Sequence, residues 1–406
     1  MKRIGGNSYI TKEEQEIYLD KVSLKDLTKQ YSTPIMIFLE NRLRENLKVF
    51  QDVFESVFKT FQGFYSFKAN FLPEICEIIS SEGIGAEVIG LPELKLALKI
   101  GVPPERILVG GPYMPEELIL FSMKNKVREI IVYNINDLNK INAIAEKLGV
   151  KQKICIRIIS KRYGAKLGIT LDNENLIKIE NAIKKSKNIE ISTILAHYGT
   201  QMNNSKQFEK NIDIIESNLL KLHSIGLHIE NINLGGGFPE ASVMPKKQLK
   251  KIALNIRDSL KYRGINYKQI YFEPGRYFVG DTGLFVTNIV KVTKDRWIFL
   301  NIGNHICPKF ARSSLRFYNT SKIENPHKYK TSIAGIIPSD QDVLAKDYFF
   351  TDDLDEGDVV LVVNVGAYNL TFSNRFPYSL PNIILVKDNV FKLIFDNQID
   401  HDFSLN

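Results

Sequence analysis

The hydrophobic pattern between residues 61 and 273 alternates short apolar runs with longer amphipathic stretches. The runs cover residues 61–67, 84–89, 106–110, 129–133, 153–159, 191–197, 228–234 and 269–273. Each shows little polar alternation, which is typical of parallel strands buried on both faces. Helix signals lie between them; for example, Pro92 and Glu93 occupy the first turn of a stretch that Gly101 ends. Eight strands alternating with helices predict an α/β fold of the (β/α)8 barrel type.

The pattern changes after residue 285. Apolar runs at 284–292, 297–300, 332–337, 358–363, 382–386 and 390–396 are separated by turns, without a long helical pattern. One further strand is expected at 35–39, before the barrel, and we expect it to join these later strands. We therefore predict two domains: a barrel over 36–285, and an all-β domain, a sandwich or barrel, built from 1–35 with 286–406.

Composition places the chain among ordinary globular proteins, with 44% hydrophobic and 25% charged residues over 406 positions. The net charge of +8 comes from scattered lysines, so no nucleic-acid partner is expected, although anionic small molecules are favoured. Three distant cysteines suit a reducing cytoplasm. No signal peptide is evident, and the longest apolar run, 359–368, is shorter than the roughly 18 residues of a membrane span.

Two candidate chemical groups follow the first and sixth predicted strands. Lys68 follows the first strand and His197 follows the sixth. Working residues of such barrels lie at the carboxyl ends of the strands. Taken singly, Lys68 is explained better as a surface lysine, and a lone histidine such as His197 is more often a hydrogen-bonded structural residue than a catalyst. Their matching positions make a shared site the stronger hypothesis.

The seventh and eighth strands are followed by a possible anion site. Gly235, Gly236 and Gly237 allow the backbone to approach a ligand closely, although a glycine triplet alone is as often a flexible turn. Glu273 ends the eighth strand and Arg276 follows three residues later. The loops after strands seven and eight commonly hold phosphate in such barrels. A mutual salt bridge between Glu273 and Arg276 is the alternative.

Together these groups match the needs of pyridoxal 5'-phosphate. This cofactor requires a lysine for a Schiff base, a phosphate site, and a group that tunes its pyridine nitrogen. Lys68, the glycine triplet with Arg276, and Glu273 supply these parts, and His197 can stack on the ring. No metal-ligand set is expected.

The chain resembles the fold-type III pyridoxal-phosphate decarboxylases, which include diaminopimelate, ornithine and arginine decarboxylases. The resemblance covers nearly the whole chain. It is carried by Tyr65-Ser66-Phe67-Lys68-Ala69-Asn70, the stretch 83–107, His197-Tyr198-Gly199-Thr200-Gln201, Gly235-Gly236-Gly237-Phe238-Pro239, Glu273-Pro274-Gly275-Arg276 and Gly366-Ala367-Tyr368. Each motif alone is weak, but six in order are a strong signal. The family fold is the barrel with a β domain.

The resemblance implies roles for individual residues. Lys68 would form the Schiff base, His197 would stack on the ring and Glu273 would pair with the pyridine nitrogen. The phosphate would be surrounded by Thr200, Gly235, Gly236, Gly237, Arg276 and Tyr368, while Glu87 and Arg157 match supporting positions of the pocket. It also implies an amino-acid substrate and a homodimer with active sites at the subunit interface.

One departure from the family concerns the substrate side. The family usually has a cysteine and then an acidic residue in a Gly-x-x-Cys segment that reaches across the dimer, whereas Pro338 stands at the cysteine position here. In the family this cysteine assists reprotonation at Cα after CO2 leaves. Proline has no acidic proton, so this role is absent or has moved to Asp340, Cys307 or His305. Lys309 and Arg312 are candidates to hold a remote substrate carboxylate.

Three functions follow from these observations. The leading hypothesis is a decarboxylase of an α-amino acid or an amino-acid conjugate. A pyridoxal-phosphate racemase, or other chemistry at Cα, is the second, because the usual cysteine is missing. A degenerate regulatory homologue is the third, and the retention of Lys68, His197 and Glu273 argues against it.

Overall fold

The computed structural model describes residues 2–160, 162, 164–185, 187–311 and 314–399, which form two units. One unit comprises 47–239 with 244–275, and the other comprises 1–46, 240–243 and 276–406. None of the described helices combines the length and the apolarity that a membrane crossing needs.

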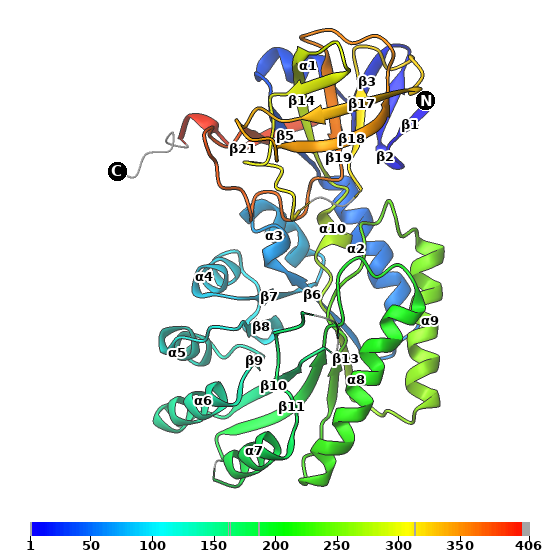
Figure 1. Ribbon diagram of the computed structural model, residues 1–406. Helices are drawn as coiled ribbons and strands as arrows, with labels where there is room; N and C mark the ends of the chain where they lie inside the picture. The colour runs from blue at the N-terminus through cyan, green and yellow to red at the C-terminus, as the bar shows by residue number, and fades with distance from the viewer. Residues whose placement is uncertain (1, 161, 163, 186, 312–313, 400–406) are drawn as a thin grey trace. The chain divides into compact units, whose positions relative to one another are not determined.

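The first unit is a closed barrel of eight parallel strands in sequence order (Figure 1). The strands are β6 (Phe61–Ser66), β7 (Gly85–Val88), β8 (Ile107–Gly110), β9 (Glu129–Val132), β10 (Gln152–Ile158), β11 (Ile189–Ala196), β12 (Asn231–Asn233) and β13 (Gln269–Phe272). Nearly all their residues are buried, as expected for strands covered on both faces. The predicted barrel is confirmed, and each of the eight apolar runs overlaps one of its strands.

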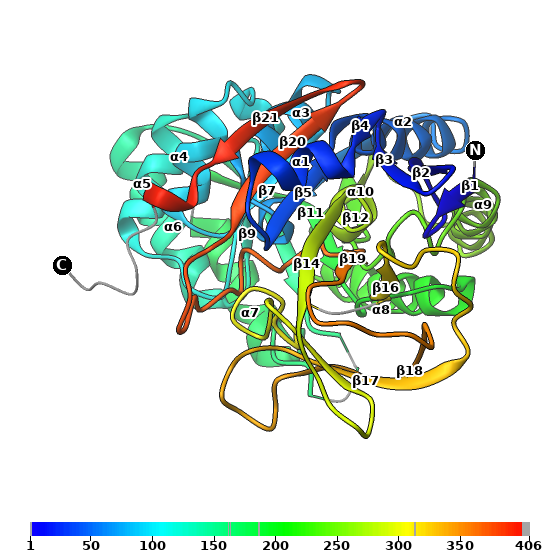
Figure 2. The ribbon, with the colours of Figure 1, turned by 90° about the horizontal axis from the view of Figure 1, so that it is seen from above.

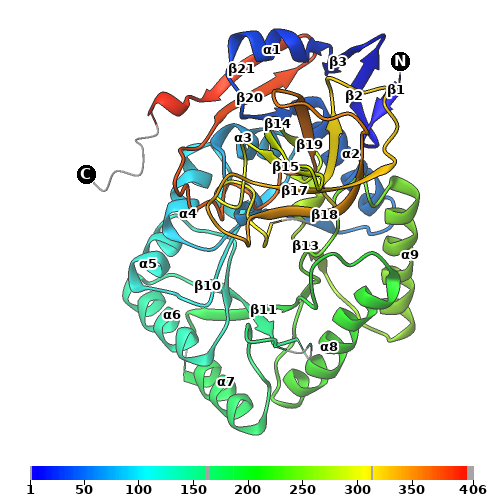
Figure 3. The ribbon, with the colours of Figure 1, turned by 45° about the horizontal axis from the view of Figure 1, so that its top comes forward.

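Helices cover the outside of the barrel, as Figure 3 shows for α4 to α8. They are α3 (Pro73–Ser81), α4 (Leu91–Lys99), α5 (Glu116–Lys124), α6 (Ile135–Leu148), α7 (Asn173–Lys185), α8 (Ser205–Ser224) and α9 (Lys246–Tyr262), while α2 (Glu40–Glu55) spans the boundary between the units. Helix α6 shows why they form where they do. The Asn134 side chain accepts a hydrogen bond from the Asp137 N–H at its start, and Gly149 ends it at φ 64°.

Apolar side chains fill the barrel interior in its middle layer. Phe64, Leu108, Ile131, Cys155, Leu195 and Tyr271 form this cluster with Tyr133. Because strand side chains alternate between two faces, the inward positions continue two residues further on. Polar residues two positions away from this apolar cluster along a strand therefore also point into the barrel, nearer to one of its two ends.

The second unit is built mainly from strands. β1 (Lys2–Ile4), β2 (Asn7–Glu13), β3 (Glu16–Leu19) and β4 (Val22–Ser23) form an antiparallel sheet, followed by α1 (Leu24–Gln30). A nine-stranded sheet contains β5 (Ile35–Leu39), β14 (Gly283–Val292), β15 (Trp297–Leu300), β16 (Arg316–Asn319), β17 (Tyr329–Ala334), β18 (Val343–Phe350), β19 (Val359–Val363), β20 (Asn382–Lys387) and β21 (Val390–Phe395). The short helix α10 (Arg276–Val279) precedes β14.

The larger sheet joins the two ends of the chain. β5 pairs antiparallel with β14 and parallel with β20, so the strands run side by side in Figure 2. A core that includes Leu27, Ile37, Leu361 and Ile384 packs behind them. The predicted strand at 35–39 is confirmed in this unit. The sheet is mixed, and with α1 and α10 present the unit is not made of strands alone.

Candidate active site

The candidate site lies at the carboxyl ends of the barrel strands. Lys68 belongs to the short turn Phe67–Ala69 directly after β6, and its Nζ lies 3.6 Å from Oε2 of Glu87 on β7. Glu87 is buried, and its Oε2 also accepts a hydrogen bond from the Ser66 hydroxyl. An ammonium beside a desolvated carboxylate is held in a defined position. Lys68 therefore points to the barrel mouth with its amine located by Glu87.

A second carboxylate, Glu273, follows β13 at the same end. Its Oε1 accepts a hydrogen bond of 2.7 Å from the Asn233 amide on β12. Desolvation and the neighbouring Glu87 raise the pKa of Glu273 above its ordinary range, and the charge of Lys68 opposes this. A buried carboxylate of this kind suits a partner that shares a proton with it, such as a pyridine nitrogen.

The glycine triplet packs against the chain on both sides of Glu273. The Glu273 N–H donates to the Gly235 carbonyl at 2.9 Å, and a Cβ on Gly236 would lie 2.3 Å from the Glu273 carbonyl oxygen. Gly235 and Gly237 have φ of 63° and 91°. Among the described residues, no hydrogen bond uses the N–H of Gly236 or Gly237. This loop therefore fits the role of an anion cradle.

His197 follows β11 and lies against the same loop. A Cβ on Gly235 would come within 2.7 Å of the His197 Nδ1 atom. Desolvation lowers the pKa of His197 to about 3, and the charges of Arg157, Lys68 and Arg162 act in the same direction. The imidazole is consequently neutral at physiological pH, and a neutral flat ring can stack on a protonated pyridine ring without charge repulsion.

A cavity of about 270 Å³ opens beside His197. Three cationic side chains line it: Arg157, Arg162 and Lys166. The Arg157 guanidinium donates to the Tyr133 hydroxyl at 2.9 Å and lies 4.8 Å from the centre of that ring. Arg162 lies against Gly199, where a Cβ would meet its guanidinium. The cavity is therefore strongly basic.

The remaining predicted residues are distributed between the two units. Thr200 is exposed on the loop after β11 in the barrel unit. Arg276 and Tyr368 belong to the other unit, where the guanidinium lies 4.8 Å from the Tyr368 ring centre. Asp340 and Lys309 are exposed in that unit, and Arg312 lies outside the described residues.

The loop containing Pro338 is organised by a residue that the sequence analysis did not single out. Asp342 is buried and accepts hydrogen bonds from the N–H groups of Asn304 (2.7 Å) and Ile337 (2.8 Å). Cys307 and His305, the alternative proton donors, are both buried. Desolvation lowers the pKa of His305 to about 4, so it is neutral near pH 7.

Sequence reasoning also missed Asn233, Tyr133, Arg162 and Lys166. A signal for Asn233 was present, because Asn231 and Asn233 alternate with Ile232 in a strand whose inward positions are thus polar. Tyr133 follows β9 as Lys68 follows β6. Among the described residues, no three His, Cys, Asp or Glu side chains gather into a metal site.

Comparison with known proteins identifies the family. Residues 41–280 match the family model described as pyridoxal-dependent decarboxylase, pyridoxal binding domain. The chain is 26% identical to diaminopimelate decarboxylase of Aquifex aeolicus, covering 91% of this chain and 90% of that protein. It is also 26% identical to L-glutamyl-[BtrI acyl-carrier protein] decarboxylase of Niallia circulans, covering 93% and 94%.

Solved structures give the same fold. Diaminopimelate decarboxylase of M. jannaschii aligns with a TM-score of 0.86 and 24% identity, over 96% of this chain and 95% of that one. The matched segment contains Lys68, His197, the glycine triplet, Glu273 and Arg276, and it extends over more than half of the chain. This chain belongs to the pyridoxal-dependent decarboxylases.

Proposed function

We propose that this pyridoxal-phosphate enzyme removes the α-carboxylate of an amino acid or amino-acid conjugate, with Lys68 as the residue that holds the cofactor covalently. The observation behind the proposal is the convergence of Lys68, Glu87, His197, Glu273 and the glycine triplet at one end of the barrel. Lys68 contacts Glu87 at 3.6 Å, and the Glu273 N–H donates a hydrogen bond of 2.9 Å to Gly235, which also lies against His197. The charges of Glu87 and Lys68 act on Glu273.

The residues fit the cofactor part by part. The Lys68 amine would bind the aldehyde, Glu273 would hold a proton at the pyridine nitrogen, and neutral His197 would cover the ring. The free N–H groups of Gly236 and Gly237, with Thr200, Arg276 and Tyr368, would bind the phosphate. Bound pyridoxal phosphate supplies the electron sink that stabilises the carbanion left when CO2 departs.

Substrate choice would depend on the basic cavity beside His197. Arg157, Arg162 and Lys166 favour a substrate with a carboxylate or another anionic group remote from the reacting carbon. Arg157 is the best positioned of the three, because Tyr133 holds its guanidinium. Diaminopimelate and an L-glutamyl conjugate, the substrates in the names of two relatives, are the first compounds to test. Lys309, Arg312 and Asp340 stay predictions for the same part of the site.

Borohydride reduction tests the cofactor linkage. We expect the reduced protein to contain a pyridoxyl group on the peptide with Lys68, and we expect Lys68→Ala to lose it. Lys95→Ala, a change on the outer helix α4, is the matched control and should label normally. A label on another lysine, or none, would contradict the assignment.

Product analysis separates decarboxylation from other chemistry at Cα. With Pro338 at the family's cysteine position, the second candidate is racemisation. In D2O, a decarboxylase should release CO2 in proportion to the deuterium that enters the product. Exchange of the Cα hydrogen without CO2 release would favour the racemase.

The proposal includes a cytoplasmic homodimer. The three cysteines are free and buried, as suits a reducing compartment. Sedimentation should give twice the chain mass of 46.4 kDa. A fully active species with the mass of a single chain would refute the dimer, but it would not bear on the assignment of the cofactor.

A further inference from the structure

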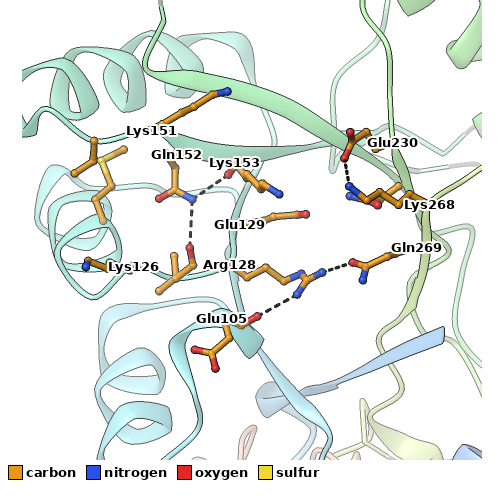
Figure 4. A pocket seen from close by; sticks show the side chains of 14 residues that line it. Glu105, Lys126, Arg128, Glu129, Lys151, Gln152, Lys153, Glu230, Lys268 and Gln269 are labelled. Atoms are coloured by element: carbon orange, nitrogen blue, oxygen red, sulfur yellow. Dashed lines mark hydrogen bonds and ion pairs between the residues drawn. The ribbon is translucent and has the colours of Figure 1, made fainter. Parts of the chain in front are cut away.

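A larger cavity opens at the other end of the same barrel. It has a volume of about 650 Å³, within the range of small-molecule sites. Its lining lies at the amino-terminal starts of the strands, and Figure 4 shows Glu129 at the start of β9, Gln152 at the start of β10 and Gln269 at the start of β13. Asn231, which begins β12, also lines the cavity. Lys68 and Glu273 follow the carboxyl ends of their strands. The cavity is therefore distinct from the candidate active site.

Two buried oxygen acceptors in the lining have no hydrogen-bond donor within the part of the chain that the structure describes. Glu129 and Asn231 are only 1% and 4% exposed. Oε1 of Glu129 accepts from the Thr193 hydroxyl at 2.9 Å, and the Asn231 amide donates to that hydroxyl at 3.3 Å. Among the described residues, Oε2 of Glu129 and Oδ1 of Asn231 have no partner. Both side chains contact the Thr193 hydroxyl, and both line the same cavity.

Unpaired buried acceptors are costly and therefore point to a missing donor. Leaving such a group unsatisfied costs about 1–3 kcal/mol, and more when it is charged. Desolvation raises the pKa of Glu129 to about 7, although the Thr193 hydrogen bond and the charges of Arg128 and Lys153 oppose this, so its negative charge is only partly compensated in the free protein. A ligand ammonium would satisfy both oxygens and stabilise the charged carboxylate.

Cationic side chains surround these acceptors. Lys126, Arg128, Lys151, Lys153 and Lys268 line the cavity against the acids Glu105, Glu129 and Glu230. Three of these cations are engaged: Lys151 pairs with Glu190 at 2.7 Å, Lys268 pairs with Glu230 at 3.5 Å, and Arg128 donates to the Glu105 carbonyl, Gln269 and Tyr271.

Two cations of the lining remain available. Lys126 and Lys153 are exposed, and they form no ion pair within the described part of the chain. A simple anion would meet the buried Glu129, and a simple diamine would meet five cations. Only a ligand with both a positive and a negative charge matches the buried acceptors on one side and the available lysines on the other.

We propose that this cavity is a second ligand site, which binds a small zwitterion through an ammonium at Glu129 and Asn231 and a carboxylate at Lys126 and Lys153. The site stands on its own contacts and does not depend on the proposed reaction. It offers the protein a place for amino-acid-like effectors at the end of the barrel opposite the chemistry.

Ligand-observed NMR on the cofactor-loaded protein tests this site. The probes are L-proline and piperidine-4-carboxylate, zwitterions whose secondary amines cannot form a neutral imine with the cofactor aldehyde. Pyrrolidine and acetate are the half-ligands, each with one charge. We expect saturable binding of at least one zwitterion, at least about tenfold tighter than either half-ligand, because two charge-assisted contacts act together.

Two independent variants locate the binding. Glu129→Gln should weaken zwitterion binding about tenfold or more, and so should the exposed double change Lys126→Met with Lys153→Met. Glu180→Gln and Lys184→Met, on the outer helix α7, are the matched controls and should bind normally. No saturation by either zwitterion, equal binding of a half-ligand, or binding that survives in either test variant would each overturn the proposal. Loss of CO2 release is measured separately and bears only on the proposed function.

Discussion

At the scale of single residues, the pairing of Glu273 with Asn233 determines what the candidate site can do. Asn233 donates to one carboxylate oxygen, so the other oxygen is the one a ligand can use. Glu87 and Lys68 push the pKa of Glu273 in opposite directions, which makes its protonation sensitive to both. A buried group balanced in this way is typical of working sites.

Glu273→Gln tests this balance directly. Glutamine keeps the shape and can still accept from Asn233, but it cannot hold a proton on a pyridine nitrogen. We expect CO2 release to fall about 100-fold or more while the protein stays folded, because charge stabilisation in a buried site is worth several kcal/mol. Glu190→Gln, at the amino-terminal end of β11, is the control. Activity within about twofold of the unmodified enzyme would remove Glu273 from the mechanism.

Glu129 makes a separate prediction about stability. Its pKa rises from the ordinary 4.5 to about 7 on folding, because burial disfavours the charge. The folded state therefore holds the proton more tightly than the unfolded state, and stability falls as pH rises from about 4.5 to about 7. Glu129→Gln should lack this loss and gain up to about 3 kcal/mol relative to the unmodified protein by pH 8. Urea unfolding without ligands at pH 4.5, 6 and 8 measures the free energy of unfolding of both proteins. A difference between them that is constant with pH would contradict this prediction.

Residue identities predicted the reactive and cofactor-binding residues better than the residues that position them. Lys68, His197, Glu273 and the glycines stand out because their side chains, or lack of them, are unusual at strand ends. Tyr133 and Arg162 are ordinary residue types, and their importance comes from contacts across neighbouring loops, such as Arg162 against Gly199. Such contacts depend on three-dimensional register, which one sequence does not contain.

At the scale of elements, the glycine loop after β12 leaves no room for an added side chain. A Cβ at Gly236 would lie 2.3 Å from the Glu273 carbonyl oxygen, so either the loop or the end of β13 must move. Backbone atoms give way less easily than a flexible side chain. The position of this loop, which we propose to bind the phosphate, is thus tied to the position of Glu273.

Gly236→Ala should therefore weaken cofactor retention and lower the melting temperature together. We expect a loss of about tenfold or more in pyridoxal-phosphate affinity, because the N–H groups of the loop shift from the phosphate. Gly90→Ala is the control, since a Cβ there meets only Pro92 at 3.6 Å. Absorbance titration with the cofactor measures the affinity. Normal affinity in Gly236→Ala would show that the loop does not bind the phosphate.

Barrel strands were predictable because burial on both faces leaves continuous apolar runs. The strands β1 to β4, β16 and β18 were missed because their sequences contain no long continuous apolar run. In β18, the adjacent polar residues Lys346 and Asp347 interrupt the apolar run at the edge of the sheet, and β16 has only four residues. Strand β17 begins and ends three residues earlier than expected: its pairing with β18 starts at Tyr329 opposite Phe350 and ends at Ala334 opposite Val343.

At the scale of the whole molecule, the sequence predicted which segments belong together without predicting their contacts. The placement of 35–39 with the later strands is confirmed by its pairing with β14 and β20. A domain division into 36–285, and 1–35 with 286–406, stays our prediction. The cavity at the amino-terminal end of the barrel had no signal, because its lining comes from the starts of several strands and the turns before them.

Net charge leads to a prediction about substrate encounter. The chain has a formal charge of +8, and Arg157, Arg162 and Lys166 line the cavity beside His197. A positive field at the barrel mouth raises the encounter rate of an anionic substrate, and added salt screens that field. We expect kcat/KM for a substrate of net negative charge to fall severalfold between about 20 and about 200 mM salt. For an amino acid of zero net charge it should change by less than about twofold. Arg162→Gln should flatten the first dependence, whereas Lys95→Gln on the outer helix α4 should not. Equal salt dependence for the two substrates would mean that the cavity does not select an anionic group, and the substrate would then have to be sought among amino acids without one.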